Sequence, residues 1–420
     1  MKPLLLLTAL IISSSFGYTQ KDTINVLFLG NSYIGVNNLP KMVHDVASSA
    51  GTVINYDSNT PGGYTLQLHS TNATSIQKIK AGDLDFVVLQ EQSQLPSFPT
   101  NQVQTDVYPY AVALNSMINS NNPCAETVFY MTWGRKNGDS GNCPNWPPVC
   151  TYDGMDSLLN LRYTTMANAN SAILSPVGAL WHYLRDNRPD IELYSADESH
   201  PSLAGSYAAA CSFFSVLTRK DPTLITDDLG LPPHEAEIIR TVAKAVLYDD
   251  FVKWNVGSFN PISKLIADTA GNHIVSFTNT SNYSNEFLWD FGDGNTSTDE
   301  NPNHTYSVPG LFTITLIASN CGNYPDTISI NHAVHFSASI HGINSQSNIA
   351  IYPNPFSANV YIDVNELVNL KILNATGKFI LEIKQFNGGK IDFNDFRKGV
   401  YLCLLTNEKG LKYSKKVVKY

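Results

Sequence analysis

The stretch Thr23–Pro40, TINVLFLGNSYIGVNNLP, sets the pattern for the first half of this 420-residue chain. Its apolar run, Ile24–Leu29, predicts a short strand buried on both faces, as in a parallel sheet. The run stops at Gly30, and a helical pattern starts near Leu39. Ser32 is therefore expected at the carboxyl edge of the sheet, where open α/β folds bind ligands. A serine hydroxyl there becomes a nucleophile only if a base removes its proton; otherwise Gly-Asn-Ser is a simple turn.

A candidate base lies in the segment DESHP, residues 197–201, which follows the last predicted strand of this region, Ile191–Tyr194. We expect this segment to share the sheet edge with Ser32. A carboxylate three residues before a histidine can fold behind the imidazole, fix its tautomer and leave the other ring nitrogen as a base. The alternative is that Asp197 only caps a helix that starts after it. Together with Ser32, Asp197 and His200 favour a catalytic interpretation.

Strand and helix patterns alternate as far as Trp254, which predicts an α/β domain with a three-layer, flavodoxin-like parallel sheet covered by helices on both faces. The expected strands are Ile24–Leu29, Val53–Tyr56, Phe86–Leu89, Thr127–Met131 and Ile191–Tyr194. No Gly-x-Gly-x-x-Gly motif or phosphate loop follows the first strand, so no nucleotide cofactor is expected. No His-Glu-x-x-His motif or paired-cysteine spacing is present, so no metal is expected.

The remaining segments divide the chain into further parts. Residues 1–20 carry Lys2, a short apolar core and small residues, the pattern of a secretory signal peptide. The α/β domain is expected over 21–256, followed by a linker at 257–271. Short strands between Asn, Gly and Pro turns predict two small all-β sandwiches, at 272–336 and 349–420, joined by a Ser/Asn-rich linker at 337–348.

Charge and cysteine content limit the possible partners. The net charge of −9 argues against a nucleic-acid partner. The segment from Asn365 to Tyr420 is basic, with 11 Lys and Arg against five Asp and Glu, which indicates a separate module. No later run is long and apolar enough for a transmembrane helix. An exported chain can form disulfides, and the short Pro-rich loop between Cys143 and Cys150 predicts one; the pairing of the other four cysteines stays open.

The motifs of the first domain resemble those of the SGNH (GDSL-type) hydrolases over roughly Asn25–Trp254. Gly-Asn-Ser-Tyr, ending at Tyr33, matches the nucleophile block, with Asn31 where the family usually has aspartate. The resemblance implies that Ser32 is the nucleophile, His200 the general base and acid, and Asp197 its orienting partner. It also implies that the amides of Ser32 and Gly63 donate to the oxyanion of an ester-hydrolysis intermediate.

One block departs from that family. The usual Gly-x-Asn-Asp sequence after the third strand is replaced by Leu-Gln-Glu-Gln-Ser, residues 89–93, which contains no asparagine. Counting from the strand places Gln92 where the asparagine would be, with Gln90 as the other candidate. A glutamine amide has the same donor chemistry on a longer stem, so either residue is a candidate third oxyanion donor.

The two following modules also resemble known families. The motif WDFGDG, residues 289–294, together with Asn301-Pro302 and Tyr306, resembles a PKD domain, and Trp289 is expected in its core. The motif YPNPF, residues 352–356, and the closing KKVV, residues 415–418, resemble the C-terminal sorting domain of the type IX secretion system. That resemblance implies export across an outer membrane by the type IX machinery, a secreted or cell-surface location and, usually, removal of the tail.

The most specific expectation is a secreted serine esterase that removes O-acetyl groups from a polysaccharide. The alternatives are a lipase or aryl esterase, and a non-catalytic carbohydrate-binding protein on a hydrolase scaffold. Substrate contacts are expected at Tyr64 and in the loop 133–153, which is long enough for a binding loop. In this loop Trp133, Trp146 and Tyr152 offer flat faces for a sugar ring, and Arg135 can reach a carboxylate or carbonyl. Filling of the crevice under the loop is the alternative role for these aromatic residues.

Overall fold

The computed structural model describes residues 23–271, 273–321, 323–335, 349–410 and 412–420. Two compact units are present, one up to Val334 and the other from His335 on. The predicted signal peptide (1–20) and the predicted second linker (337–348) lie outside the described residues. None of the helices in the described ranges has the length and apolar character that a bilayer crossing requires.

A five-stranded sheet in the order β2-β1-β3-β4-β5 forms the centre of the N-terminal domain, and all neighbouring pairs are parallel. The strands are β1 (Thr23–Leu29), β2 (Val53–Asn59), β3 (Phe86–Leu89), β4 (Glu126–Tyr130) and β5 (Ile173–Ser175). Four consecutive residues are buried at the end of β1 and throughout β3, as expected for strands covered on both faces. The predicted α/β, flavodoxin-like architecture is confirmed.

The fifth strand was predicted wrongly. It is Ile173–Ser175, whereas Ile191–Tyr194 forms no strand and contributes only an isolated bridge between Tyr194 and Pro201. The three residues of β5 are too few to show an alternating pattern of their own. The apolar pattern of the preceding helix also continues into them without a break. Ile191, Leu193 and Tyr194 are buried by packing, which produces the apolar pattern that was mistaken for a strand.

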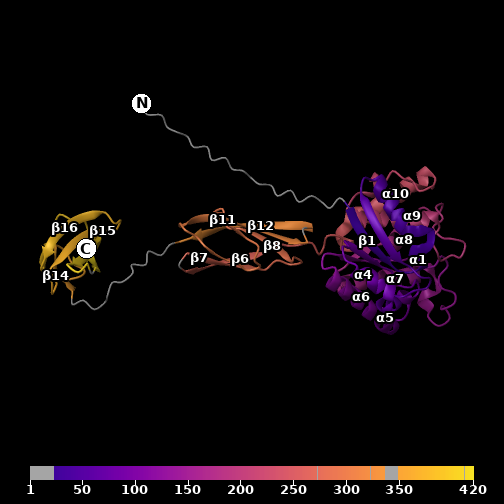
Figure 1. The fold of residues 1–420 in the computed structure, drawn as a ribbon, viewed down its shortest axis with the longest axis horizontal. Helices are drawn as coiled ribbons and strands as arrows, with labels where there is room; N and C mark the ends of the chain where they lie inside the picture. The colour runs from indigo at the N-terminus through magenta and orange to yellow at the C-terminus, as the bar shows by residue number, and fades with distance from the viewer. Residues whose placement is uncertain (1–22, 272, 322, 336–348, 411) are drawn as a thin grey trace, which may run out of the picture. The chain divides into compact units, whose positions relative to one another are not determined.

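Helices cover both faces of the sheet. Helix α2 packs against α9 and α4 against α6, and Figure 1 shows α4, α5 and α6 on one side of the domain with α9 and α10 on the other. Right-handed crossovers require this division, because the β1-to-β2 step runs in the opposite direction from the later ones. The helices are α2 (Leu39–Ser49), α3 (Leu66–Thr71), α4 (Ala73–Lys80), α5 (Thr100–Asp106), α6 (Tyr108–Asn121), α7 (Tyr152–Ala169), α8 (Val177–Asn187), α9 (Leu203–Thr218) and α10 (Pro233–Val246).

The second domain is a sandwich of two antiparallel sheets, β10-β7-β6 and β12-β11-β8-β9. Its strands are β6 (Leu265–Gly271), β7 (Ile274–Asn279), β8 (Glu286–Asp290), β9 (Thr296–Ser297), β10 (Asn303–Thr305), β11 (Gly310–Asn320) and β12 (Asn323–Val334). The predicted linker 257–271 is therefore corrected at its C-terminal end, because β6 pairs with β7 and belongs to the sandwich. Trp289 is fully buried and its indole donates to Asp299 O at 3.0 Å, so it is a core residue as expected.

The C-terminal unit is a second antiparallel sandwich, with sheets β13-β14-β17 and β16-β15-β18-β19. Its strands are β13 (Ala350–Tyr352), β14 (Asn359–Asp363), β15 (Val368–Asn374), β16 (Phe379–Phe386), β17 (Gly389–Asp392), β18 (Gly399–Asn407) and β19 (Lys412–Lys419). Alternate side chains of β14, β15 and β18 point into one shared core. This alternation agrees with the predicted all-β fold.

Two disulfides are present, and one of them joins the first two domains. Cys143–Cys150 closes the loop before α7, as predicted. Cys124–Cys321 links the segment just before β4 to the turn between β11 and β12; the two cysteines are 197 residues apart in the sequence. The thiols of Cys211 and Cys403 are buried and free. The α/β domain and the first sandwich are therefore covalently tied by this bond in addition to the linker that connects them.

Replacing both Cys124 and Cys321 with serine should separate the unfolding of these two domains. Loss of a cross-link of this kind costs about 2–4 kcal/mol, and domains joined by a linker alone unfold more independently. We expect calorimetry of the variant to show an additional transition at lower temperature. The control is the Cys143→Ser/Cys150→Ser variant, which opens only a local loop. If the Cys124→Ser/Cys321→Ser variant unfolds like the parent chain, the Cys124–Cys321 bond does not couple the two domains.

Candidate functional site

The turn after β1 presents Ser32 at the first position of a short helix, α1 (Ser32–Gly35). The turn requires glycine at position 30, because a Cβ there would lie only 2.5 Å from Gln90 Oε1 and would clash with it. Asn31 is buried and extended, and its Oδ1 accepts the amide of Tyr33 at 3.1 Å, which caps the helix. Local sequence thus fixes Ser32 at the carboxyl edge of the sheet, as predicted.

His200 lies beside Ser32 although 168 residues separate them. Its Nε2 is 2.8 Å from Ser32 Oγ, and its Nδ1 bonds to Asp197 Oδ2. Asp197 Oδ1 also accepts the backbone amides of Ser199 and His200, at 3.1 and 2.9 Å. The carboxylate therefore shapes the loop as well as orienting the imidazole, and the predicted trio Ser32, His200 and Asp197 forms one hydrogen-bonded chain.

Burial works to raise the pKa of Asp197, but hydrogen bonds from His200 and from the loop amides outweigh it and lower the pKa to about 2. The carboxylate is therefore ionised at every pH at which the chain is expected to work. A fixed negative charge at Nδ1 requires the proton of a neutral imidazole to lie on that nitrogen, which leaves Nε2 as an acceptor towards Ser32.

An aromatic stack connects the turn that carries Ser32 to the loop that carries His200. The rings of Tyr33 and Trp133 lie parallel at 4.9 Å, and Trp133 stacks on Trp181 at 3.6 Å. The indole of Trp133 donates to Ser199 O at 3.1 Å, and Tyr33 Oη lies 2.7 Å from Ser199 Oγ. Trp133 was predicted as a sugar-binding face, and this prediction is wrong: the side chain is fully buried between the nucleophile turn and the His200 loop.

A second loop, which carries Gly63, is hydrogen-bonded to the nucleophile turn. Gly63 has φ +70°, a backbone conformation that side chains disfavour. Asn31 Nδ2 donates to Tyr64 O at 2.9 Å, so one side chain caps the Ser32 helix and anchors the glycine loop. Tyr64 is half-buried, with its hydroxyl accepting from Asn72 at 3.1 Å. Sequence reasoning noted Asn31 as a departure from the aspartate of the family but missed this tethering contact.

The two glutamines have different environments. Gln90 is fully buried; its Oε1 accepts the amide of Asn31 at 2.9 Å and its Nε2 donates to Glu91 O. Gln92 is half-buried, and its Oε1 accepts the amides of Gln94 and Leu95 at 2.8 and 3.1 Å. Gln90 is therefore the glutamine in contact with the nucleophile turn. A role for either amide in the oxyanion hole stays a prediction.

Two buried titratable side chains that the sequence did not single out support this edge of the sheet. His69 Nε2 is 2.9 Å from Gly30 O, and its Nδ1 is 2.7 Å from Ser75 Oγ. Burial lowers the pKa of His69, so a neutral ring donates to the carbonyl and accepts from the serine. Glu91 is fully buried, with its carboxyl 3.2 Å from Leu66 N and 2.5 Å from Gln92 N. It thereby joins the loop after β3 to the helix that follows Gly63.

The loop between β4 and α7 forms a structured wall. Asp139 is buried at its centre, where it accepts from Gln94 Nε2 at 2.6 Å and Asn142 Nδ2 at 2.7 Å. Arg135 Nη1 lies 3.4 Å from Asp139 Oδ1, and about a third of the Arg135 side chain is exposed. Burial works to raise the pKa of Asp139, but its hydrogen bonds and the charge of Arg135 hold it below the usual value.

Two aromatic residues of this loop, Trp146 and Tyr152, are less exposed than predicted. Trp146 is half-buried against the core, and its indole donates to Ser97 O at 2.9 Å. Tyr152 is buried beneath the guanidinium of Arg185, which lies 3.9 Å from its ring centre, so its predicted role as a sugar platform is wrong. Arg135, and in part Trp146, are the predicted contact residues of this loop that remain accessible.

These features define an α/β domain with a Ser-His-Asp arrangement at the carboxyl edge of its sheet. Family models match two later segments of the chain: residues 260–334 match the PKD domain, and residues 350–420 match the secretion system C-terminal sorting domain. The chain thus contains both predicted modules. The sorting domain indicates export by the type IX system to the cell surface or beyond it.

Solved structures are similar to the N-terminal part. A DUF4886 family protein from Bacteroides uniformis ATCC 8492 is 17% identical, with a TM-score of 0.46, over 55% of this chain and 95% of that one. A candidate SGNH hydrolase from Slackia heliotrinireducens is 25% identical, with a TM-score of 0.39, over 46% of this chain and 98% of that one. The search of curated proteins found no match.

The tether from Asn31 predicts that Asn31→Asp will distort the site without unfolding the chain. Aspartate keeps the cap to Tyr33 N but replaces the donor to Tyr64 O with a repelling oxygen. Misplacement by about 1 Å can cost about 10²-fold in rate, so kcat should fall by about that factor on any substrate that Ser32 attacks. Steady-state kinetics and thermal melting test this. The matched control is Asn121→Asp on the exposed surface of α6, and equal kinetics in both variants would exclude the tether.

Glu91 predicts a specific dependence of stability on pH. Burial raises its pKa from 4.5 to about 8, although the amides of Gln92 and Leu66 oppose the rise. Between these pH values the folded chain keeps a proton that the unfolded chain has lost, so the free energy of unfolding falls as pH rises. Glu91→Gln should flatten this slope in urea titrations at pH 5, 6.5 and 8. Exposed Glu237→Gln should leave it unchanged, and identical slopes in parent and Glu91→Gln would refute the assignment.

Proposed function

We propose that the chain is an exported serine ester hydrolase. The observation that carries the proposal is the continuous hydrogen-bonded series Ser32–His200–Asp197, with 2.8 Å between Ser32 Oγ and His200 Nε2. A histidine held at Nδ1 by an ionised carboxylate and at Nε2 by a serine is the arrangement that activates a serine hydroxyl. A binding protein on the same scaffold has no need for this geometry.

The proposed reaction proceeds in two acyl transfers. Ser32 Oγ attacks the ester carbonyl while His200 Nε2 accepts its proton and then passes that proton to the leaving alcohol. Water attacks the acyl-enzyme with His200 again as base, and the carboxylic acid leaves as Ser32 recovers its proton. Asp197 stays ionised and stabilises the imidazolium that forms in each half-reaction.

The developing oxyanion requires preorganised donors. The amides of Ser32 and Gly63 are proposed for this role, with Gln92 or Gln90 as the third donor; each such donor contributes about 3–4 kcal/mol to transition-state stabilisation. The contact of Asn31 with Tyr64 O supports the pairing of Ser32 with Gly63, because it fixes one loop relative to the other.

For the substrate we propose an ester on a large polar molecule, most specifically an O-acetyl group on a polysaccharide. Two features support this choice. The side chains of His200 and Asp197 are 32% and 49% exposed, so the triad lies at the surface, where a polymer can reach it. Export places the enzyme where such polymers occur. A lipase or aryl esterase is the alternative, although no feature of the described site favours it. Trp146, Arg135 and Tyr64 are the proposed substrate contacts.

Ser32→Ala should lower the rate of ester hydrolysis by several orders of magnitude while leaving the melting temperature nearly unchanged, because only the nucleophilic oxygen is removed. A small acetyl ester provides the assay, and loss of covalent labelling by a serine-directed phosphonate, which phosphonylates the serine oxygen, provides a second readout. Ser116→Ala on exposed α6 is the control. Retained hydrolysis in Ser32→Ala would exclude the proposed mechanism.

The loop that Cys143–Cys150 closes should select the polymer and not the acetyl group. Trp146→Ala should reduce acetate release from an acetylated polysaccharide by at least tenfold while sparing the small ester, because a half-exposed ring contributes binding area only to the larger substrate. Trp146→Phe keeps an aromatic face without the bond to Ser97 O and should restore most of the activity. Equal losses on both substrates would show that the loop only supports the triad.

A further inference from the structure

A pocket lies at the opposite end of the sheet from Ser32. The carboxyl end of β1 carries Ser32, whereas the pocket is lined by Cys124–Thr127, where β4 begins. Because β1 and β4 both run parallel to β3, these places are the two opposite edges of one sheet. The pocket has a volume of about 350 Å³, within the size range of small-ligand sites. It is therefore distinct from the proposed catalytic site.

Two domains form the walls of this pocket, and several contacts fix them together. The Cys124–Cys321 disulfide closes one side. On another side the Arg219 guanidinium lies over the ring of Tyr324, 3.5 Å from its centre, and donates to Asn260 Oδ1 at 3.0 Å. Covalent and charged contacts of this kind keep the pocket open in one shape, which lowers the entropy lost when a ligand binds.

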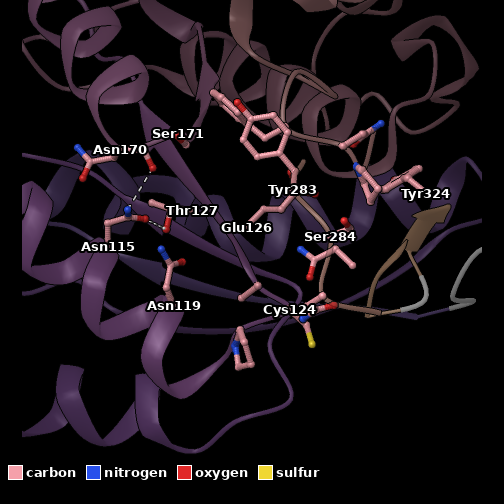
Figure 2. A pocket seen from close by; sticks show the side chains of 17 residues that line it. Asn115, Asn119, Cys124, Glu126, Thr127, Asn170, Ser171, Tyr283, Ser284 and Tyr324 are labelled. Atoms are coloured by element: carbon pink, nitrogen blue, oxygen red, sulfur yellow. Dashed lines mark hydrogen bonds between the residues drawn. The ribbon is translucent and has the colours of Figure 1, made fainter. Parts of the chain in front are cut away.

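Amide, hydroxyl and aromatic groups dominate the lining, as Figure 2 shows. Among the polar and aromatic members are Asn115, Asn119, Glu126, Phe259, Tyr283 and Ser284. Some of these serve the fold, because Asn115 is held by Thr127 at 2.7 Å and by Asn170 O at 3.1 Å. Asn119, one turn further along α6, makes no side-chain hydrogen bond within the described chain, and Ser284 Oγ is buried without a partner there.

The aromatic groups give the pocket a flat apolar element. Tyr283 is 47% exposed and packs edge-on against Phe259, with 5.5 Å between ring centres. A sugar ring has an apolar C–H face that packs on such a ring, and its hydroxyls both donate and accept hydrogen bonds. Side-chain amides such as Asn119 also do both.

Charge in the pocket is internally compensated. Arg219 Nη2 lies 3.5 Å from Glu126 Oε1, so neither a cation nor an anion is favoured by an unmatched charge. Burial raises the pKa of Glu126, although the nearby Arg219 opposes the rise. The chemistry of the lining therefore favours a neutral ligand that is rich in hydroxyl groups.

We propose that this pocket binds one or two sugar units of a neutral glycan, as a non-catalytic site. Asn119 and Ser284 supply hydrogen bonds to the sugar hydroxyls, and Tyr283 with Phe259 supplies the stacking face. The site requires both domains, so the α/β domain and the first sandwich together form it. It does not depend on ester hydrolysis.

Isothermal titration of the full-length chain with neutral tetrasaccharides of xylose, glucose, mannose and galactose tests the proposal. At least one should bind with a Kd below about 1 mM, which corresponds to about −4 kcal/mol. Asn119→Ala combined with Tyr283→Ala should weaken that binding at least tenfold, whereas Tyr283→Phe should weaken it less because it keeps the stacking face. The matched control is Asn121→Ala combined with Tyr183→Ala, which removes exposed side chains of the same types from α6 and α8.

Two further readouts separate this site from the catalytic one. Ser32→Ala should bind the tetrasaccharide unchanged, and the Asn119/Tyr283 variant should hydrolyse a small acetyl ester at the parental rate. Melting curves establish that each variant is folded. Failure of all four sugars to bind, or unchanged binding in the folded Asn119/Tyr283 variant, overturns the proposal. An inactive parent chain that still binds sugar through Tyr283 would refute the esterase proposal and leave this one intact.

Discussion

The hydrogen bond between Ser32 and His200 joins two segments that are 168 residues apart, and the stack of Tyr33, Trp133 and Trp181 holds those segments in place. Tyr33 follows Ser32 directly in the chain, and Trp133 donates to Ser199 O beside His200. Both ends of the bond are thus fixed to the same three rings. Two large aromatic contacts with parallel rings combine apolar burial with a defined geometry, so the stack positions the site as well as stabilising the fold.

Beneath the nucleophile turn lies a set of buried polar groups that hold one another. Gln90 accepts from Asn31 N, His69 contacts Gly30 O, and Glu91 contacts the amide of Leu66. Buried polar groups destabilise a fold unless they are paired, and a fully paired set specifies one arrangement. This explains how the sheet edge that carries Ser32 can contain several polar side chains with little exposure.

The two edges of the sheet have separate surroundings. The carboxyl edge carries Ser32, His200 and the loop closed by Cys143–Cys150. The amino edge meets the first sandwich, where Cys124–Cys321 and Arg219 fix the joint. Parallel strands produce this separation, because all their carboxyl ends lie on one side and all their amino ends on the other. On our proposals, ester chemistry belongs to one edge and glycan retention to the other.

Sequence alone predicted the α/β alternation, both all-β modules and the proximity of Ser32, Asp197 and His200. Each depends on a local signal: apolar runs, turn residues, and a carboxylate three residues before a histidine. It failed at Ile191–Tyr194, where packing under neighbouring helices produced a strand-like pattern, and at β6, which a Gly- and Ser-containing segment concealed. Ser32, Asp197 and His200 do meet in the structure, although the route to that prediction was wrong, because the His200 loop follows no strand. Their catalytic role stays a prediction.

What the sequence determined by itself is therefore the local conformation, including the Gly30 turn, the Asn31 cap and the fold of Asp197 behind His200. Only the tertiary structure decided which side chains meet. It buried Trp133 and Tyr152, left Trp146 half-exposed, paired Cys124 with Cys321 and placed Glu91 and His69 under the nucleophile turn. The physical reason is range: capping and turn formation act within a few residues, whereas stacking, burial and disulfide pairing depend on contacts between segments that sequence spacing does not encode.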